Sequence, residues 1–131
     1  MKHSVMLTIS TLLSIILFAS HWAYEVAHGW ETGGVSGLGG IAILVVWLCG
    51  TLLLPERRSG YIITLVGGIF GLGVLVLHMT GKGLIGGRIA TSSSVYFWVW
   101  SLIVLGVTSS FSAILSALGL WSLRGLPDKT I

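Results

Sequence analysis

The chain has 131 residues, of which 54% are hydrophobic and only 8% are charged. Soluble globular domains carry about 25% charged residues, so this composition excludes an ordinary soluble domain and predicts a membrane protein. The length allows a single domain covering residues 1–131. The formal net charge of +3 rests on seven scattered basic residues. It therefore excludes a nucleic-acid-binding surface, which needs clustered Lys and Arg.

Four long apolar runs predict four transmembrane helices, at about residues 5–24, 38–54, 61–79 and 95–123. Each run approaches or exceeds the roughly 20 residues that a helix needs to cross a hydrocarbon core about 30 Å thick. The runs are apolar on every face, whereas a membrane β-strand alternates polar and apolar residues. We therefore expect an all-α fold in which the four helices form an up-down-up-down bundle.

The first run begins close to Lys2 and resembles a secretory signal peptide in its length and flanking charge. Cleavage after Ala19, Ser20 or Ala23 would place a large side chain at the third residue before the cut, where a small residue is needed. We therefore expect this segment to remain as the first span.

Glycine- and proline-containing segments separate the runs. Residues 28–34 contain three glycines and end the first helix, and Pro55 ends the second. The fourth run is the longest, with an aromatic cluster at residues 96–100 and Trp121 at its other end. Aromatic residues at both ends are typical of a helix that meets the two membrane interfaces.

Basic residues near the span ends predict the orientation, because cytoplasmic loops carry an excess of Lys and Arg. With the N-terminus inside, the outer side has only Lys82 and Arg88. The inner side then has the larger basic set, which consists of Lys2, Arg57, Arg58, Arg124 and Lys129. Both termini are therefore expected in the cytoplasm.

Small residues at helical spacing indicate how the spans pack, because they let the backbones of membrane helices approach closely. We expect the third and fourth spans to meet in the inner half of the membrane through two stripes, Gly60, Thr64, Gly67 and Gly71 on one and Ser109, Ala113, Ser116 and Ala117 on the other. The alternative is that these residues face a partner subunit, or reflect the high frequency of Gly in membrane helices.

The densest polar group lies at the outer end of the first span. His21, Glu25 and His28 are separated by four and three residues, so they share one face of a helix. His78 lies near the outer end of the third span, at a similar expected depth. Imidazole and carboxylate suit Zn, Cu or Fe, and Glu25-x-x-His28 has the spacing of di-metal carboxylate bundles, although the other spans offer no second such pair.

Two other interpretations of the same residues stay open. A haem could take His21 or His28 as one axial ligand and His78 as the other. Alternatively, Glu25 pairs with His21 one turn earlier, while His28 and His78 stabilise the ends of their helices. We favour the structural roles, because interfacial polar residues commonly serve as anchors. We therefore expect no bound cofactor.

Other functional signals are weak. No Asp, Glu, Lys or Arg falls within the four apolar runs, which argues against transport driven by ions or protons. The chain has no CxxC or HExxH motif, and the segment from Gly81 to Arg88 lacks the Lys-Ser/Thr ending of a phosphate-binding loop. We therefore expect no catalytic residues and no enzymatic activity.

Two segments carry a resemblance, WLCGTLLLPERRSGYII at residues 47–63 and LHMTGKGL at residues 77–84. In them the chain resembles a set of uncharacterised small four-span bacterial membrane proteins. The resemblance implies an inner-membrane location in a bacterium. No activity follows from it.

The sequence favours a non-catalytic structural or accessory membrane component that acts through helix packing. Its expected partners are the lipid bilayer and either a second copy of the chain or another membrane protein, with no nucleic acid. The first alternative is a metal- or haem-binding redox module built on His21, Glu25, His28 and His78. The second is a small transporter or pore, for which the serine-rich face of the fourth span offers a polar stripe.

Overall fold

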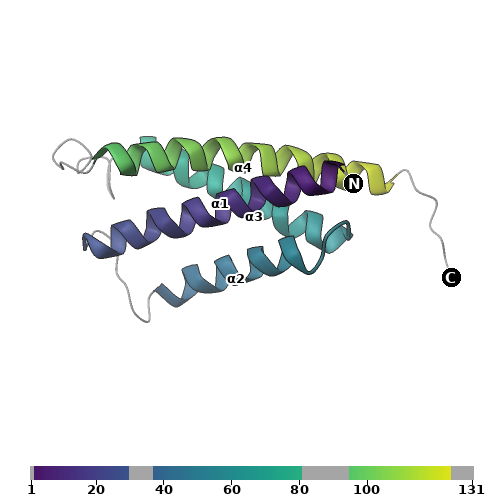
Figure 1. Cartoon of the computed structure of the whole chain (residues 1–131), viewed down its shortest axis with the longest axis horizontal. Helices are drawn as coiled ribbons and strands as arrows, with labels where there is room; N and C mark the ends of the chain where they lie inside the picture. The colour runs from purple at the N-terminus through teal and green to yellow at the C-terminus, as the bar shows by residue number, and fades with distance from the viewer. Residues whose placement is uncertain (1, 30–36, 81–94, 125–131) are drawn as a thin grey trace.

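Four α-helices make up the computed structural model, which describes residues 2–29, 37–80 and 95–124. They are α1 (Lys2–Ala27), α2 (Leu38–Leu52), α3 (Arg58–Thr80) and α4 (Val95–Arg124). Successive helices run in opposite directions (Figure 1), which confirms the expected all-α bundle of four helices. The start of α1 and the end of α4 lie at one end of the bundle, called here the termini end, and the opposite end is called the far end.

Some of the basic residues that predict the orientation lie outside the described residues. This applies to Lys82, Arg88 and Lys129, and also to the glycine-rich segment from Gly81 to Arg88. The four other basic residues in the count lie within the described part of the chain.

The helices end where local chemistry stops them. Helix α1 ends at Ala27, and Gly29 follows in the left-handed region at φ +67°, the conformation that glycine adopts most easily at a helix C-terminus. In the turn between α2 and α3, Glu56 has φ 62° and is the one non-glycine residue with positive φ in the described ranges. Gly60 is required beside this turn, because a Cβ there would overlap the carbonyl oxygen of Leu54.

Three helices are long and apolar enough to cross a membrane, namely α1, α3 and α4. Helix α2 is also apolar but has 15 residues. At 1.5 Å of rise per residue it covers about 22 Å, which is less than the roughly 30 Å of a hydrocarbon core. The four expected spans thus correspond to three helices of full length and one shorter helix.

The bundle carries apolar side chains on its outside and many polar side chains in its interior. Ile16, Val66 and Leu77 are among the large apolar residues that are exposed. The described residues with no exposed surface include Thr11, Ser14, Ser109, Ser112 and Ser116. Small polar residues between helices and apolar residues around them are typical of a bundle whose solvent is lipid.

The helices form a ring in which each one contacts the next along the chain, and α4 closes the ring against α1. The α3–α4 contact is the most extensive and the α1–α4 contact is second. Helix α2 packs less extensively against α3 and α1. Helix α4 is therefore the main support of the bundle.

Small residues allow α3 and α4 to approach closely. A Cβ at Gly68 would lie 2.8 Å from the carbonyl oxygen of Ser109, and a Cβ at Gly71 would overlap the Ser109 side chain. Nearer the termini end, Thr64 Oγ1 and Ser116 Oγ form a hydrogen bond of 2.8 Å between the two helices. Larger apolar residues at positions 68 and 71 would prevent this close approach, and apolar residues at positions 64 and 116 would remove the hydrogen bond.

The remaining residues of the expected packing set have different neighbours. Ala113 lies opposite Gly68, as expected for the contact between α3 and α4. Gly67 instead faces α2, where a Cβ would overlap the ring of Trp47. Ala117 is exposed on the surface of α4. The glycine-rich helix α3 thus uses two faces, one for α4 and one for α2.

Hydrogen bonds between side chains also hold α1 against α4. Thr11 Oγ1 and Ser112 Oγ are 2.8 Å apart, and Ser14 Oγ donates to Thr108 Oγ1 at 2.9 Å. The serine-rich face of α4 is therefore occupied by helix packing within one chain.

Candidate metal centre

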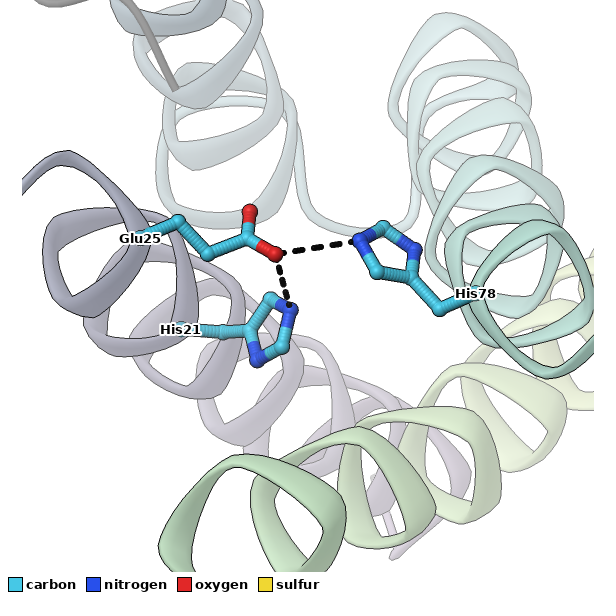
Figure 2. Close-up of side chains that lie close together, drawn as sticks. All are labelled: His21, Glu25 and His78. Atoms are coloured by element: carbon cyan, nitrogen blue, oxygen red, sulfur yellow. Dashed lines mark hydrogen bonds and ion pairs between the residues drawn. The ribbon is translucent and has the colours of Figure 1, made fainter. Parts of the chain in front are cut away.

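Two imidazoles and a carboxylate converge near the far end of the bundle (Figure 2). His21 and Glu25 come from successive turns of α1, and His78 comes from the last turn of α3. His21 is 1% exposed, Glu25 is 4% exposed, and the side chain of His78 is 14% exposed. We call these three residues the His–Glu–His cluster. Because polar groups this deeply buried need partners, their hydrogen bonds decide what the cluster can do.

Glu25 Oε1 is the centre of the cluster. It lies 3.4 Å from His21 Nε2 and 3.2 Å from His78 Nε2. The indole N–H of Trp98, on α4, donates to the same oxygen at 3.0 Å. Side chains from three helices therefore meet at one carboxylate oxygen.

Ser101 determines which nitrogen of His21 carries the ring hydrogen. The Ser101 hydroxyl donates its single proton to the Trp98 carbonyl oxygen at 2.9 Å. With its proton in that bond, the Ser101 oxygen accepts from His21 Nδ1, which lies 3.1 Å away. The hydrogen of neutral His21 is thus on Nδ1, and Nε2 presents a lone pair. This Nε2 is buried and has no hydrogen-bond partner.

A backbone carbonyl determines the same tautomer for His78. Its Nδ1 lies 2.7 Å from the Val74 carbonyl oxygen, which can only accept, so Nδ1 donates. The Nε2 of neutral His78 therefore also presents a lone pair to Glu25 Oε1. Three electron-rich atoms point at one another, and their repulsion is relieved by a positive charge between them. That charge is either a proton or a metal ion.

The distances in the cluster suit a small metal ion. Bonds of about 2.0–2.1 Å place neighbouring ligand atoms of a tetrahedral zinc ion about 3.3 Å apart. The two nitrogen–oxygen distances of 3.4 and 3.2 Å match that separation. All three ligand atoms lie within 4.8 Å of one another. Ser101 and the Val74 carbonyl are outer partners of the kind that orient metal-binding histidines.

The structure brings together three of the four residues that the sequence singled out. His28 lies at the end of α1, where it is exposed and its Nδ1 is 2.9 Å from the Tyr24 carbonyl oxygen. Its ring stacks on the Tyr24 ring with a centroid distance of 4.0 Å. His28 is thus placed outside the group of converging ligand atoms.

Sequence reasoning misses Trp98 and Ser101. Trp98 belongs to an aromatic cluster that fits an interfacial belt, and Ser101 is one of several serines in the same helix. A signal exists in their spacing, because residues three apart share a helix face. That face is predicted near the outer end of the fourth span, at the depth of His21 and His78.

The same geometry does not fit a haem held between His21 and His78. The rings of His21 and His78 are 5.3 Å apart between centroids and inclined at 78°. The Glu25 carboxylate lies between them, and the Trp98 ring contacts both, at 5.1 and 5.4 Å. A porphyrin placed between the two imidazoles would have to displace both of these side chains. The residues therefore fit a metal ion better than a macrocycle.

Comparisons with known proteins add no family to this geometry. No family model, curated protein or solved structure matches the chain. The resemblance to four-span bacterial proteins stays a prediction from the sequence. The His–Glu–His cluster is therefore the feature of the described residues that bears on function.

Proposed function

We propose that this chain is a multi-pass membrane protein that binds one divalent transition-metal ion between His21, Glu25 and His78. The observation that supports this function is the convergence of the Nε2 atoms of His21 and His78 on Glu25 Oε1. Each imidazole is held in that tautomer by a hydrogen bond at its Nδ1. Burying a carboxylate beside two imidazole lone pairs costs free energy, and a cation bound between these groups offsets that cost.

The donor atoms favour particular ions. Two imidazole nitrogens and one carboxylate oxygen suit Zn²⁺, Cu²⁺ or Fe²⁺. Magnesium and calcium prefer six or more oxygen ligands, which this buried cluster does not offer. The proposed ligand is therefore a first-row transition-metal ion.

We also propose that the termini end faces the cytoplasm and that the far end faces outward from a bacterial inner membrane. The described basic residues near helix ends, Lys2, Arg57, Arg58 and Arg124, belong to segments at the termini end. The excess of Lys and Arg on cytoplasmic surfaces supports this orientation. The cluster would then receive its ion from the outer side.

A structural or accessory role is the second candidate. The cluster connects α1 to α3 through His78 and to α4 through Trp98, so it can join three helices through a shared proton instead of an ion. The protein would then act through its helix faces, on a second copy or on another membrane protein. Metal content distinguishes the two functions.

The test is metal binding by the full chain, purified in detergent and stripped with a chelator. Titration with Zn²⁺ and elemental analysis after dialysis are expected to give one ion per chain. His78→Ala removes one of three protein ligands and is expected to weaken the affinity by about 100-fold or more, since losing even an outer partner costs about 10–100-fold. An absorbance spectrum of the purified protein, recorded before the chelator is added, tests for haem.

His28→Ala is the matched control, because it removes an imidazole from the next turn of α1 that is not among the converging ligand atoms. Its affinity for Zn²⁺ is expected to equal that of the unchanged protein. Absence of a stoichiometric ion in the unchanged protein contradicts the proposed function. An equal loss of affinity in the His28 and His78 variants contradicts the assigned ligands.

A further inference from the structure

The hydrogen bond from Trp98 divides the Glu25 carboxylate into two unequal oxygens. Oε1 accepts the Trp98 indole N–H at 3.0 Å and faces both imidazoles. Figure 2 shows Oε1 between the two rings and the other oxygen directed away from them. The carboxylate is thus oriented to offer one oxygen to an ion, not two.

Trp98 has little freedom to give up this contact. It is 1% exposed, and its ring packs against the rings of His21 and His78. Its N–H therefore cannot turn to water. A carboxylate oxygen can accept at two lone-pair sites, so Oε1 keeps one for an ion while Trp98 occupies the other.

We infer that Trp98 is a positioning residue that holds Glu25 as a one-oxygen ligand and makes the site selective for a four-coordinate ion, above all Zn²⁺. This inference rests on the proposed metal site. Two nitrogens and one oxygen leave a single further position, which water or a small anion can fill. The Trp98 ring closes one face of the cluster, so ions that favour more ligands, such as Ni²⁺, bind less well.

Removing the indole N–H frees the carboxylate to rotate. Glu25 can then bind an ion through both oxygens, which raises the coordination number and lowers the advantage of Zn²⁺. The affinity for Zn²⁺ also falls by about 10–100-fold, the usual effect of losing an outer partner of a metal ligand. The Trp98 contact therefore predicts a change in geometry as well as a change in strength.

The experiment replaces Trp98 with benzothienylalanine, whose sulfur takes the place of the indole N–H and keeps the shape of the ring. This variant preserves the packing that a Trp98→Phe variant would disturb. Co²⁺ is titrated as a spectroscopic substitute for Zn²⁺, because four-coordinate Co²⁺ absorbs visible light much more strongly than six-coordinate Co²⁺. The affinities for Zn²⁺ and Ni²⁺ are measured on the same samples. The same replacement of Trp100, which is 57% exposed on the same helix, is the matched control.

The unchanged protein and the Trp100 variant are expected to give the strong four-coordinate spectrum. The Trp98 variant is expected to give weaker bands and a ratio of Zn²⁺ to Ni²⁺ affinity lower by about 10-fold or more. A six-coordinate spectrum in the unchanged protein, or an unchanged spectrum and affinity ratio in the Trp98 variant, overturns the inference and leaves the metal site standing. Absence of any bound ion in the unchanged protein overturns the proposed function, and the inference fails with it.

Discussion

His21 shows how one buried nitrogen can define a site. A buried polar atom without a hydrogen-bond partner costs about 1–3 kcal/mol. His21 Nε2 is one of four such side-chain atoms in the described residues, together with His3 Nε2, Trp47 Nε1 and Ser109 Oγ. Ser101 creates this situation, because its hydroxyl accepts the Nδ1 hydrogen and leaves Nε2 with a lone pair. The other tautomer would donate Nε2–H to Glu25 and satisfy the pair without an ion. In the proposed metal site, the residue that prepares His21 is therefore a serine that binds no metal itself.

We expect Ser101→Ala to weaken Zn²⁺ binding by about 10-fold or more, because His21 can then place its hydrogen on Nε2. The free energy of unfolding of the metal-free protein should change by less than about 1 kcal/mol. Zinc titration and unfolding in detergent measure the two effects. Ser110→Ala is the control, since that hydroxyl bonds to the Gly106 carbonyl oxygen of its own helix. Equal zinc affinities in the two variants would show that Ser101 does not control the tautomer.

Among the elements, α3 and α4 decide how the bundle is held together. Helix α3 carries Gly67 towards Trp47 of α2, and Gly68 and Gly71 towards Ser109 of α4. In lipid there is little hydrophobic gain from pairing helices, so close packing and side-chain hydrogen bonds supply the association. Helix α4 in turn carries Trp98 to Glu25 at the far end. The α3–α4 contact thus supports the cluster as well as the fold.

Gly68→Ala should destabilise the bundle by about 1–3 kcal/mol, because the new Cβ meets backbone atoms of α4 that can move only with the helix. Those atoms are the Ser109 carbonyl oxygen at 2.8 Å and the Ala113 nitrogen at 2.9 Å. Gly73→Ala is the control, since nothing lies within 4 Å of a Cβ there, and it should leave stability unchanged or raise it by up to about 1 kcal/mol. Reversible unfolding in mixed detergent micelles measures both. Equal effects would mean that α3 and α4 do not approach as closely as described.

The molecule as a whole has two different ends joined by an apolar outer surface. Four basic residues belong to segments at the termini end, and the His–Glu–His cluster lies near the far end. This difference between the two ends depends on helix α2, because α2 returns the chain from the far end to the termini end over only 15 residues. Its position in the membrane decides whether Arg57 and Arg58 share a side with Lys2.

Cysteine labelling in intact cells tests this arrangement. In a Cys49→Ala background, Ala27→Cys at the far end should react with a membrane-impermeant maleimide, and Ser59→Cys in the first turn of α3 should react only after permeabilisation. The expectation follows from the positive-inside rule. Labelling of both positions in intact cells would mean that α2 does not cross the membrane. Reaction of Ser59→Cys alone would mean that the orientation is reversed.

The sequence by itself determined the solvent and the helices, because the length and composition of an apolar run are local properties. It also brought His21 and Glu25 together, since residues four apart lie on one helix face. It placed His78 at the same depth through the lengths of the predicted spans. These conclusions need no knowledge of how the helices pack.

Only the tertiary structure decided which atoms meet. Trp98 is 73 residues from Glu25 along the chain and Ser101 is 80 residues from His21, so only the packing of α4 against α1 brings them into contact. The same packing set the tautomer of His21 and placed His28 outside the cluster. A hydrogen bond between distant residues depends on distances and angles of a fraction of an ångström, and helical periodicity carries no such information. For that reason the candidate ligands could be predicted from the sequence, whereas the hydrogen bonds that set their tautomers could not.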